Sequence, residues 1–219
     1  MLSIIQEKKP NSILDIACGT GWLGNEIGYP SQLDGVDAFD SPPPGYLRFF
    51  KHDINNGLPN NLNSYDAAVI CEAMAYLQNP GILISSVKQH LKPGGIIIIT
   101  DPNPLYIGAR LNYLIQGFPR SHSAFVKNDS MGYHMPWMNL GLFQYWLILG
   151  INGFKNIKLH NVDEQKPKHA WERFFGFITK TYYMSRLRKS DNDNEKTLWK
   201  YAASDQHIYG RRLVISAEA

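Results

Sequence analysis

Small residues between Ala17 and Gly21 (ACGTG) form the stretch of this sequence best suited to binding a ligand. A short apolar run leads into them. The two glycines allow the backbone to turn tightly and to approach a ligand closely. If a helix begins after Gly21, its first N–H groups have no partners within the helix and point toward the same place. The stretch therefore predicts a binding turn between a strand and a helix.

Three aspartates have the spacing expected of residues that surround such a turn. Asp15 lies just before it, Asp37 ends the next apolar run, 18 positions after Gly19, and Asp53 ends the following one. A carboxylate at position 37 can accept hydrogen bonds from both hydroxyls of a ribose. Asp15 would repel a pyrophosphate but favour a cationic amino acid group. Asp53 could accept from an adenine amino group, although its neighbours are also typical of a turn.

The run Gly19–Gly24 (GTGWLG) also fits the glycine fingerprint of dinucleotide-binding proteins. Alone, it predicts an NAD(P)-dependent Rossmann oxidoreductase. The acids at 15 and 53, and the later KPGG closure followed by IIIIT, favour instead a nucleoside that carries a cationic amino acid.

The elements that must position these residues alternate between strands and helices. We expect strands at 12–16, 32–36, 47–51, 65–71, 96–100, 154–162 and 209–216, and helices at 21–27, 81–91 and 139–150. The runs at 65–71 and 96–100 are almost continuously apolar, which is typical of strands covered on both faces. The pattern predicts an α/β fold, a doubly wound and mostly parallel sheet with helices on both faces.

Two stretches, 102–138 and 166–205, interrupt this alternation. The first is rich in Pro, Gly, His and aromatic residues. The second is expected to form one or two amphipathic helices with a polar turn at 190–194. Segments of this length that interrupt a compact domain are usually functional or partly disordered. We therefore expect a single domain over 1–219, with both stretches as insertions that cap the substrate side.

The run from Ile13 to Asp101 resembles the class I (Rossmann-like) S-adenosylmethionine-dependent methyltransferases. The matching motifs are ILDIACGTG at 13–21, the acids after the second and third strands, and LKPGG at 91–95. The segment GINGFKNIKLH at 150–160 is similar to the family's step into strand six. The resemblance implies a seven-stranded sheet in the order 3-2-1-4-5-7-6, with the last strand antiparallel, and S-adenosyl-L-methionine as the cofactor.

The resemblance also implies cofactor contacts at the ends of four strands. Asp15 and the turn would hold the methionine part, Asp37 the ribose and Asp53 the adenine. Residues at the end of the fourth strand would lie beside the methyl group. The full set is Asp15, Ala17, Cys18, Gly19, Thr20, Gly21, Trp22, Asp37, Ala38, Asp53, Ile54, Cys71 and Glu72.

The sequence departs from the family pattern at two places. Ala17 stands where glycine is commonest, and we expect it to keep a negative φ, which alanine tolerates. The run EAMAYL at 72–77 replaces the family's E-x-x-E-H-L, so no role is carried over for the second acid or the histidine.

Candidate catalytic residues lie in the remaining segments. His134 could take the proton of an acceptor hydroxyl as methyl transfer proceeds, and Tyr76 could orient the acceptor. The competing interpretation is that His134 binds a backbone carbonyl in a proline turn, and His122 is a weaker second candidate. Asp101 and Asn103 could suggest a metal, but the paired acid after strand four is missing, so we expect no metal site.

We expect methyl transfer to a small-molecule, sugar or lipid-linked acceptor, through a hydroxyl. The alternatives are the oxidoreductase above and a non-catalytic scaffold that keeps the cofactor-binding fold. A nucleic acid acceptor is not expected, because an Asn/Asp-Pro-Pro-aromatic run is missing after strand four. The one feature that favours a nucleic acid acceptor is the basic segment 166–200, which has nine Lys and Arg against four Asp and Glu. The sequence does not indicate the acceptor or the oligomeric state.

Composition agrees with an intracellular enzyme. The 219 residues carry a net charge of +3 and two cysteines, and the N-terminus does not read as a secretory signal. We expect a cytoplasmic location and no disulfide. The run 171–188 predicts an amphipathic helix, either packed on the sheet or in contact with a membrane surface or a second copy.

Overall fold

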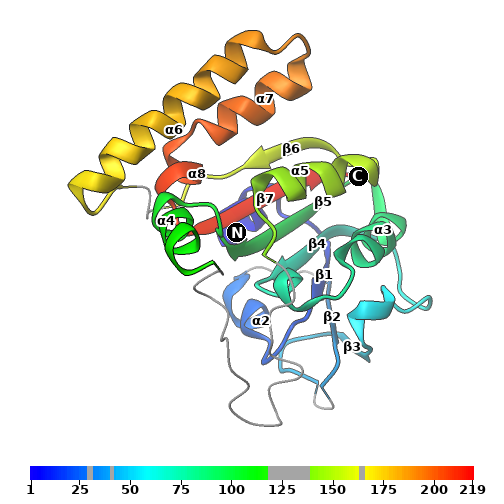
Figure 1. Ribbon diagram of the computed structural model, residues 1–219. Helices are drawn as coiled ribbons and strands as arrows, with labels where there is room; N and C mark the ends of the chain where they lie inside the picture. Colours follow the sequence, from blue (N-terminus) through cyan, green and yellow to red (C-terminus); the bar gives the residue numbers. More distant parts are fainter. Residues whose placement is uncertain (29–31, 40–41, 118–138, 163–165) are drawn as a thin grey trace.

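The computed structural model describes residues 1–28, 32–39, 42–117, 139–162 and 166–219. Within these ranges the chain forms one seven-stranded sheet with helices on both faces (Figure 1). The strands are β1 (Ser12–Ile16), β2 (Gln32–Asp37), β3 (Arg48–Lys51), β4 (Tyr65–Cys71), β5 (Leu91–Pro102), β6 (Lys155–Leu159) and β7 (Arg212–Glu218). The helices are α1 (Leu2–Lys8), α2 (Trp22–Glu26), α3 (Pro80–His90), α4 (Ile107–Gln116), α5 (Leu142–Ile151), α6 (Ala170–Lys189), α7 (Asp193–Ala202) and α8 (Asp205–Tyr209).

The strands follow the order β3-β2-β1-β4-β5-β7-β6. Strand β7 runs antiparallel to β5 and β6, and the other pairs are parallel. The predicted fold class, strand order and antiparallel last strand are confirmed. Parallel order places the carboxyl ends of β1, β2 and β4 at one edge of the sheet, where ligands of open α/β sheets bind.

The core lies on both faces of the sheet because side chains of successive strand residues point to opposite faces. Ile13 packs with α1 and α2 on one face, whereas Leu14 and Ile16 pack with α3 and α5 on the other. The IIIIT run of β5 divides in the same way, since Ile96 and Ile98 pack in the same cluster as Ile13, on the face of α1 and α2. This two-sided burial explains why the central strands are apolar without alternation.

The expected start and end of the last strand, 209 and 216, are both wrong, and the strand ends at Glu218. Residue Tyr209 belongs to helix α8 and not to the last strand, which starts at Arg212. Helix α8 is fixed by Ser204, whose side chain accepts a hydrogen bond from the N–H of His207. Such an N-cap stabilises a helix by about 1 kcal/mol.

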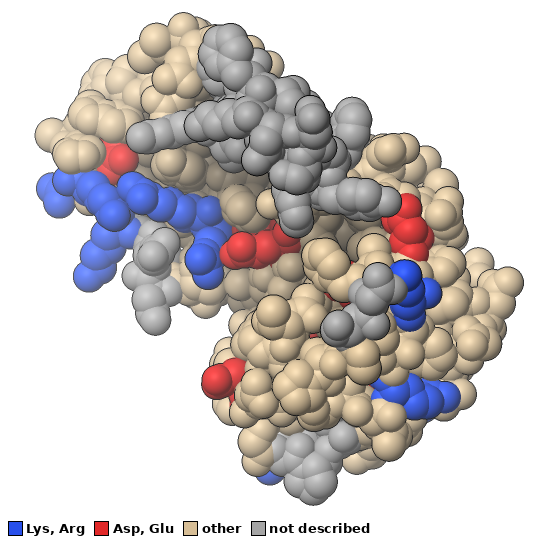
Figure 2. All heavy atoms as spheres, turned by 90° about the horizontal axis from the view of Figure 1, so that it is seen from below, with Lys and Arg blue, Asp and Glu red and all other residues tan. Residues whose placement is uncertain are grey.

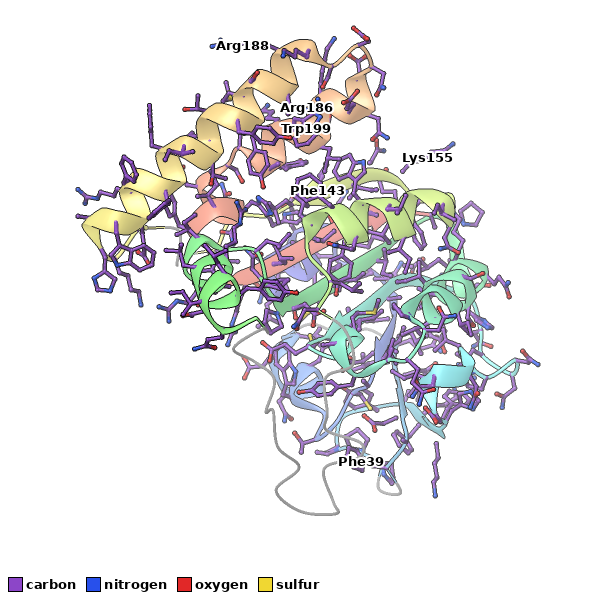
Figure 3. All side chains as sticks on the ribbon, viewed as in Figure 1. Phe39, Phe143, Lys155, Arg186, Arg188 and Trp199 are labelled. Carbon is purple, nitrogen blue, oxygen red and sulfur yellow. The ribbon has the colours of Figure 1, made fainter. Side chains whose placement is uncertain are left out.

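Residues 166–205 form a hairpin of α6 and α7 followed by the start of α8, which agrees with the predicted helices and polar turn. Helix α6 packs on α7, α8 and α4. Of the alternatives stated for this helix, packing of its aromatic side on the sheet is therefore wrong. An aromatic cluster joins the hairpin to α5: the rings of Phe143 and Trp199 are 5.5 Å apart, and Arg186 covers Trp199 at 5.4 Å (Figure 3).

None of the helices in the described ranges combines the length and the apolar composition needed to cross a bilayer. Both cysteines of the chain, Cys18 and Cys71, are free thiols.

Candidate cofactor and acceptor site

The turn after β1 is built around left-handed backbone conformations. Gly19 and Gly21 have φ values of 52° and 79°, and Ala17 has a φ of 57°. The expected negative φ at Ala17 is therefore wrong. Its N–H and that of Cys18 both donate to the carbonyl oxygen of Val36, at 2.8 and 3.3 Å, so the chain must bend directly after the strand. Strain of this kind is typical of functional sites.

Asp37 connects the end of β2 to this turn. Its carboxylate is buried and accepts hydrogen bonds from the N–H of Gly19 at 2.8 Å and of Phe39 at 3.3 Å. An ionised carboxylate offers about four lone-pair positions, so it can accept from ribose hydroxyls as well.

A cavity of about 490 Å³ opens beside the turn, which is within the size range of ligand pockets. It is lined by Ala17, Gly19, Asp37, Ala38, Phe39, Asp53, Ile54, Asn55, Cys71, Glu72, Ala73, Tyr76, Leu77 and Gln78. A Cβ built on Gly19 would meet no atom within 4 Å, so the turn leaves open space at its centre. The lining of the cavity combines carboxylates with apolar side chains, which suits the ribose and adenine of a nucleoside.

A second cavity, of about 840 Å³, meets the first at the end of β4. It is lined by Met1, Leu2, Ser3, Trp22, Cys71, Glu72, Thr100, Val162, Arg212 and Val214. Cys71 and Glu72 belong to both cavities. Glu72 has a strained φ of 51°, and its carboxylate lies 3.8 Å from the Arg212 guanidinium. The two cavities thus give a nucleoside-sized space that opens into a larger, charged one.

A family model described as a methyltransferase domain matches residues 2–209. The chain belongs to the methyltransferase domain family. Among solved structures it is similar to an S-adenosylmethionine-dependent methyltransferase from Archaeoglobus fulgidus, with 19% identity and a TM-score of 0.56 over 99% of this chain and 90% of that one. The plantazolicin methyltransferase BpumL, solved with S-adenosylhomocysteine, is 18% identical with a TM-score of 0.56 over 99% of this chain and 79% of that one.

Two curated relatives are more similar in sequence over part of the chain. The malonyl-[acyl-carrier protein] O-methyltransferase of Halalkalibacterium halodurans is 26% identical over 125 residues, which are 48% of this chain and 46% of that protein. The ubiquinone biosynthesis O-methyltransferase of Shewanella halifaxensis is 24% identical over 138 residues, 54% of this chain and 58% of that one. The chain thus spans about half the length of these relatives. The predicted family and its cofactor are confirmed, whereas the oxidoreductase alternative finds no support.

Most of the predicted cofactor residues of this methyltransferase domain lie at the two cavities. The first is lined by Ala17, Gly19, Asp37, Ala38, Asp53, Ile54, Cys71 and Glu72, and the second also by Trp22. Their direct contacts with the cofactor remain predictions. Asp53 also shows the turn chemistry that its neighbours suggested, because it accepts from the backbone and side-chain N–H groups of Asn55, both at 3.0 Å.

Asp15, Cys18, Thr20 and Gly21 are not among the residues that line either cavity. The Asp15 carboxylate is buried and accepts a 2.5 Å hydrogen bond from the hydroxyl of Tyr46, while burial raises the pKa of Asp15 to about 7. Gly21 supports the site through packing, since a Cβ there would lie 2.4 Å from that of Pro43. Contact of these four residues with the cofactor remains a prediction.

Burial raises the pKa of the Cys18 thiol to about 12 and of the Cys71 thiol to about 11. Both thiols therefore stay protonated near neutral pH, which suits small packing residues and not nucleophiles.

Sequence reasoning missed several residues of the first cavity: Phe39, Asn55, Ala73, Leu77 and Gln78. Phe39 is 59% exposed and lies just beyond β2 (Figure 3). A signal existed for Asn55, because the turn-forming run after Asp53 points to local hydrogen bonds. The side chain of Asn55 also accepts from the N–H of Gln78 at 2.9 Å, which ties the loop after β3 to the loop after β4.

The catalytic candidates have different outcomes. Tyr76 lines the first cavity and is 41% exposed. It is not among the lining residues of the second cavity, and its role in orienting the acceptor remains a prediction. His134 and His122 lie outside the described residues.

The side chains of Asp101 and Asn103 form hydrogen bonds with other parts of the chain. The Tyr145 hydroxyl donates to Asp101, and the Asn103 amide donates to the carbonyl oxygens of His207 and Gly210 at 2.9 and 2.8 Å. Burial raises the pKa of Asp101 to about 7. Within the described ranges, no group of three or more His, Cys, Asp or Glu side chains is placed to hold a metal ion.

Proposed function

We propose that the chain transfers the methyl group of S-adenosylmethionine to an oxygen of a small-molecule, sugar or lipid-linked acceptor, through a hydroxyl. One observation carries this proposal: the nucleoside-sized cavity and the larger cavity meet at Cys71 and Glu72. A cofactor whose nucleoside fills the first cavity would direct its reactive end to this border. Both curated relatives are O-methyltransferases by name, which supports oxygen as the acceptor atom.

The residues of the chain would act mainly by positioning. When bound, the cofactor supplies an electrophilic methyl group on a sulfonium. Asp37 and Asp53 would hold the nucleoside, and the Ala17–Gly21 turn would support the amino acid part. Alignment of two reactants in this way can lower a barrier by roughly 7–11 kcal/mol. Arg212, which lines the second cavity 3.8 Å from Glu72, is suited to bind an anionic group of the acceptor.

A group that takes the hydroxyl proton is a separate part of this proposal. His134 remains the predicted base, since a histidine has a reference pKa near neutrality. If it acts in this way, His134→Ala should lower turnover about 10²–10⁴-fold while cofactor affinity stays unchanged.

Titration calorimetry with S-adenosylmethionine, S-adenosylhomocysteine and NADH tests the cofactor. We expect both sulfur nucleosides to bind with micromolar affinity and NADH not to bind. Binding of NADH without response to the other two would contradict the proposal. Transfer of a labelled methyl group to a panel of hydroxyl compounds then separates an enzyme from a scaffold, because a scaffold would bind the cofactor without turnover on any acceptor.

A further inference from the structure

The outer side of α6 exposes seven large apolar side chains. They are Trp171 (41% exposed), Phe174 (62%), Phe175 (39%), Phe177 (70%), Ile178 (50%), Tyr182 (58%) and Met184 (37%). Helix α6 is the outermost element of the molecule in Figure 1, with α7 alongside its C-terminal half and α8 and α4 near its N-terminal half. The predicted amphipathic helix is present, but its aromatic side faces away from the body of the protein.

The buried side of α6 is a narrow stripe. Glu172, Gly176 and Tyr183 are buried, and this side faces α7, α8 and α4. At 3.6 residues per turn, the seven exposed apolar residues cover roughly the other half of the helix. Folded monomers rarely expose apolar patches of this extent without a function. The buried stripe accounts for the packing of α6 against its neighbours. It does not account for the seven apolar side chains on the exposed half.

Cationic side chains border this exposed half. Arg173 and Lys180 follow one of its edges, where Lys180 also pairs with Asp205 of α8 at 3.0 Å, and Arg186 follows the other. Arg188 and Lys189 end the helix. The single acid in the sequence of α6 is Glu172, and its buried carboxylate accepts hydrogen bonds from the N–H groups of Lys168 and His169. No acidic side chain of α6 therefore interrupts the exposed face.

More cations lie around the N-terminal end of α6. A cavity of about 340 Å³ there is lined by Lys166, Lys168 and Arg211, and Arg211 stacks over the ring of Tyr106 at 5.8 Å. In Figure 2, Lys and Arg side chains gather on the side of the molecule where α4 and the start of α6 lie. The positive margin thus continues from α6 to the neighbouring surface.

We propose that α6 docks on the surface of an anionic lipid bilayer. Its aromatic side would enter the boundary between headgroups and acyl chains, and its bordering cations would lie at the level of the lipid phosphates. Aromatic side chains suit this boundary because they combine an apolar body with a polarisable or polar edge. The proposal concerns a binding surface and does not depend on methyl transfer.

Charge favours a bilayer over a second copy of the chain. A two-fold contact places the same patch of both subunits face to face. The cations that border α6 would then meet each other, and like charges brought together oppose association. An anionic membrane presents the opposite charge along the same borders.

Co-sedimentation with vesicles tests this proposal. We expect the full chain to sediment with vesicles that contain phosphatidylglycerol, less so at raised salt, and weakly with phosphatidylcholine alone. A variant with Phe174→Ser and Phe177→Ser should bind the anionic vesicles roughly tenfold more weakly or worse, because two apolar anchors are lost. The matched control, Leu147→Ser with Ile151→Ser on α5, alters side chains that are 62% and 75% exposed and should bind like wild type.

A second variant tests the charges. Arg173→Gln with Arg188→Gln, which leaves the ion pair of Lys180 with Asp205 intact, should reduce the preference for anionic over neutral vesicles while binding to neutral ones stays the same. Far-UV circular dichroism and thermal melting establish that each variant is folded. The proposal is overturned if wild type does not bind anionic vesicles at low salt, or if the phenylalanine variant binds as well as wild type. It is also overturned if light scattering shows a wild-type dimer that the phenylalanine variant converts to monomers.

Discussion

At the scale of single residues, Ala17 holds a backbone conformation that L-amino acids rarely adopt, with a φ of 57°. For a residue with a Cβ this region costs about 1–2 kcal/mol. We expect Ala17→Gly to raise the free energy of unfolding by about 0.5–1 kcal/mol, since glycine's greater freedom in the unfolded chain offsets part of the gain. Urea denaturation measures this change.

The matched control is Ala109→Gly in α4, which lies in an ordinary helical conformation. It should lower the free energy of unfolding by roughly 0.5–1 kcal/mol. Equal losses in the two variants would show that the turn tolerates alanine without strain.

Asp37 is the residue on which cofactor affinity should depend most. We expect Asp37→Ala to weaken the binding of S-adenosylmethionine by about 1.5–3 kcal/mol, because hydrogen bonds to a charged group are lost. Calorimetry measures the affinity. Asp66→Ala is the control, since Asp66 pairs with Lys92 at 2.7 Å and is not among the residues lining the two site cavities. Unchanged affinity in the Asp37 variant would remove this residue from the cofactor site.

Much of the site could be predicted because parallel strands bring their carboxyl ends to one edge, so a short apolar run followed by an acid locates a residue in space. This applies to Asp37 and Asp53. The hydrogen bond between Asp15 and Tyr46 could not be predicted, because it joins residues 31 positions apart across a proline-rich loop. Likewise, the left-handed φ of Ala17 follows from its bond to Val36 and not from its residue type.

At the scale of elements, the central strands were predictable, since buried strands are recognised by continuous apolar runs. The orientation of α6 was not. Hydrophobic periodicity indicates an amphipathic helix, and the natural expectation is that the aromatic side is buried. The structure buries the side of Gly176 and Tyr183 instead, because a glycine lets α8 approach closely. The sequence pattern shows that a helix has two chemically different sides, but it does not show which of them the neighbouring elements will cover.

The close approach of α6 and α8 gives a testable consequence. A Cβ at Gly176 would lie 2.2 Å from the hydroxyl oxygen of Tyr209, so one of the two helices or the tyrosine ring must move. We expect Gly176→Ala to lower the free energy of unfolding by about 1–2 kcal/mol, the usual cost of overpacking. Thermal or urea denaturation measures the loss.

Gly150→Ala in α5 is the matched control, because a Cβ there meets nothing within 4 Å. It should raise the free energy of unfolding by up to about 1 kcal/mol through helix propensity. If both variants gain stability, Tyr209 moves aside freely and the two helices are not in close contact in solution.

At the scale of the whole molecule, buried titratable groups connect stability to pH. Burial raises the pKa of Asp15 and of Asp101 to about 7, although Tyr46 and Tyr145 donate hydrogen bonds to them. Burial lowers the pKa of His207 to about 4. The folded protein therefore favours all three side chains in their uncharged forms. Low pH favours the uncharged form of the two carboxyls, whereas high pH favours that of the histidine.

The two carboxyls and the histidine change stability in opposite directions. Between about pH 4 and pH 7, the folded state holds protons on Asp15 and Asp101 that the unfolded chain has lost, so these groups make stability fall as pH rises. Between about pH 4 and pH 6.5, the unfolded chain binds a proton at His207 that the folded state excludes, so this group makes stability rise with pH. The wild-type profile is the sum of both, and single variants are needed to separate them.

Asp101→Asn isolates one of these contributions, because asparagine keeps the shape of the side chain and cannot ionise. Relative to wild type, we expect the variant to gain stability as pH rises from about 5 to about 7, by up to about 1.4 kcal/mol per pH unit where the Asp101 carboxyl is protonated in the folded state but ionised in the unfolded chain, and to gain no more once folded Asp101 ionises above about pH 7. Urea denaturation at a series of pH values measures the difference. Asp66→Asn should show no such slope over this range, since the pKa of the partly exposed Asp66 carboxyl is lowered by its bonds to Lys92 and Ser12 and it is ionised throughout. A difference profile for Asp101→Asn that is flat above pH 5 would mean that Asp101 is ionised in the folded protein, with Tyr145 and solvent stabilising its charge.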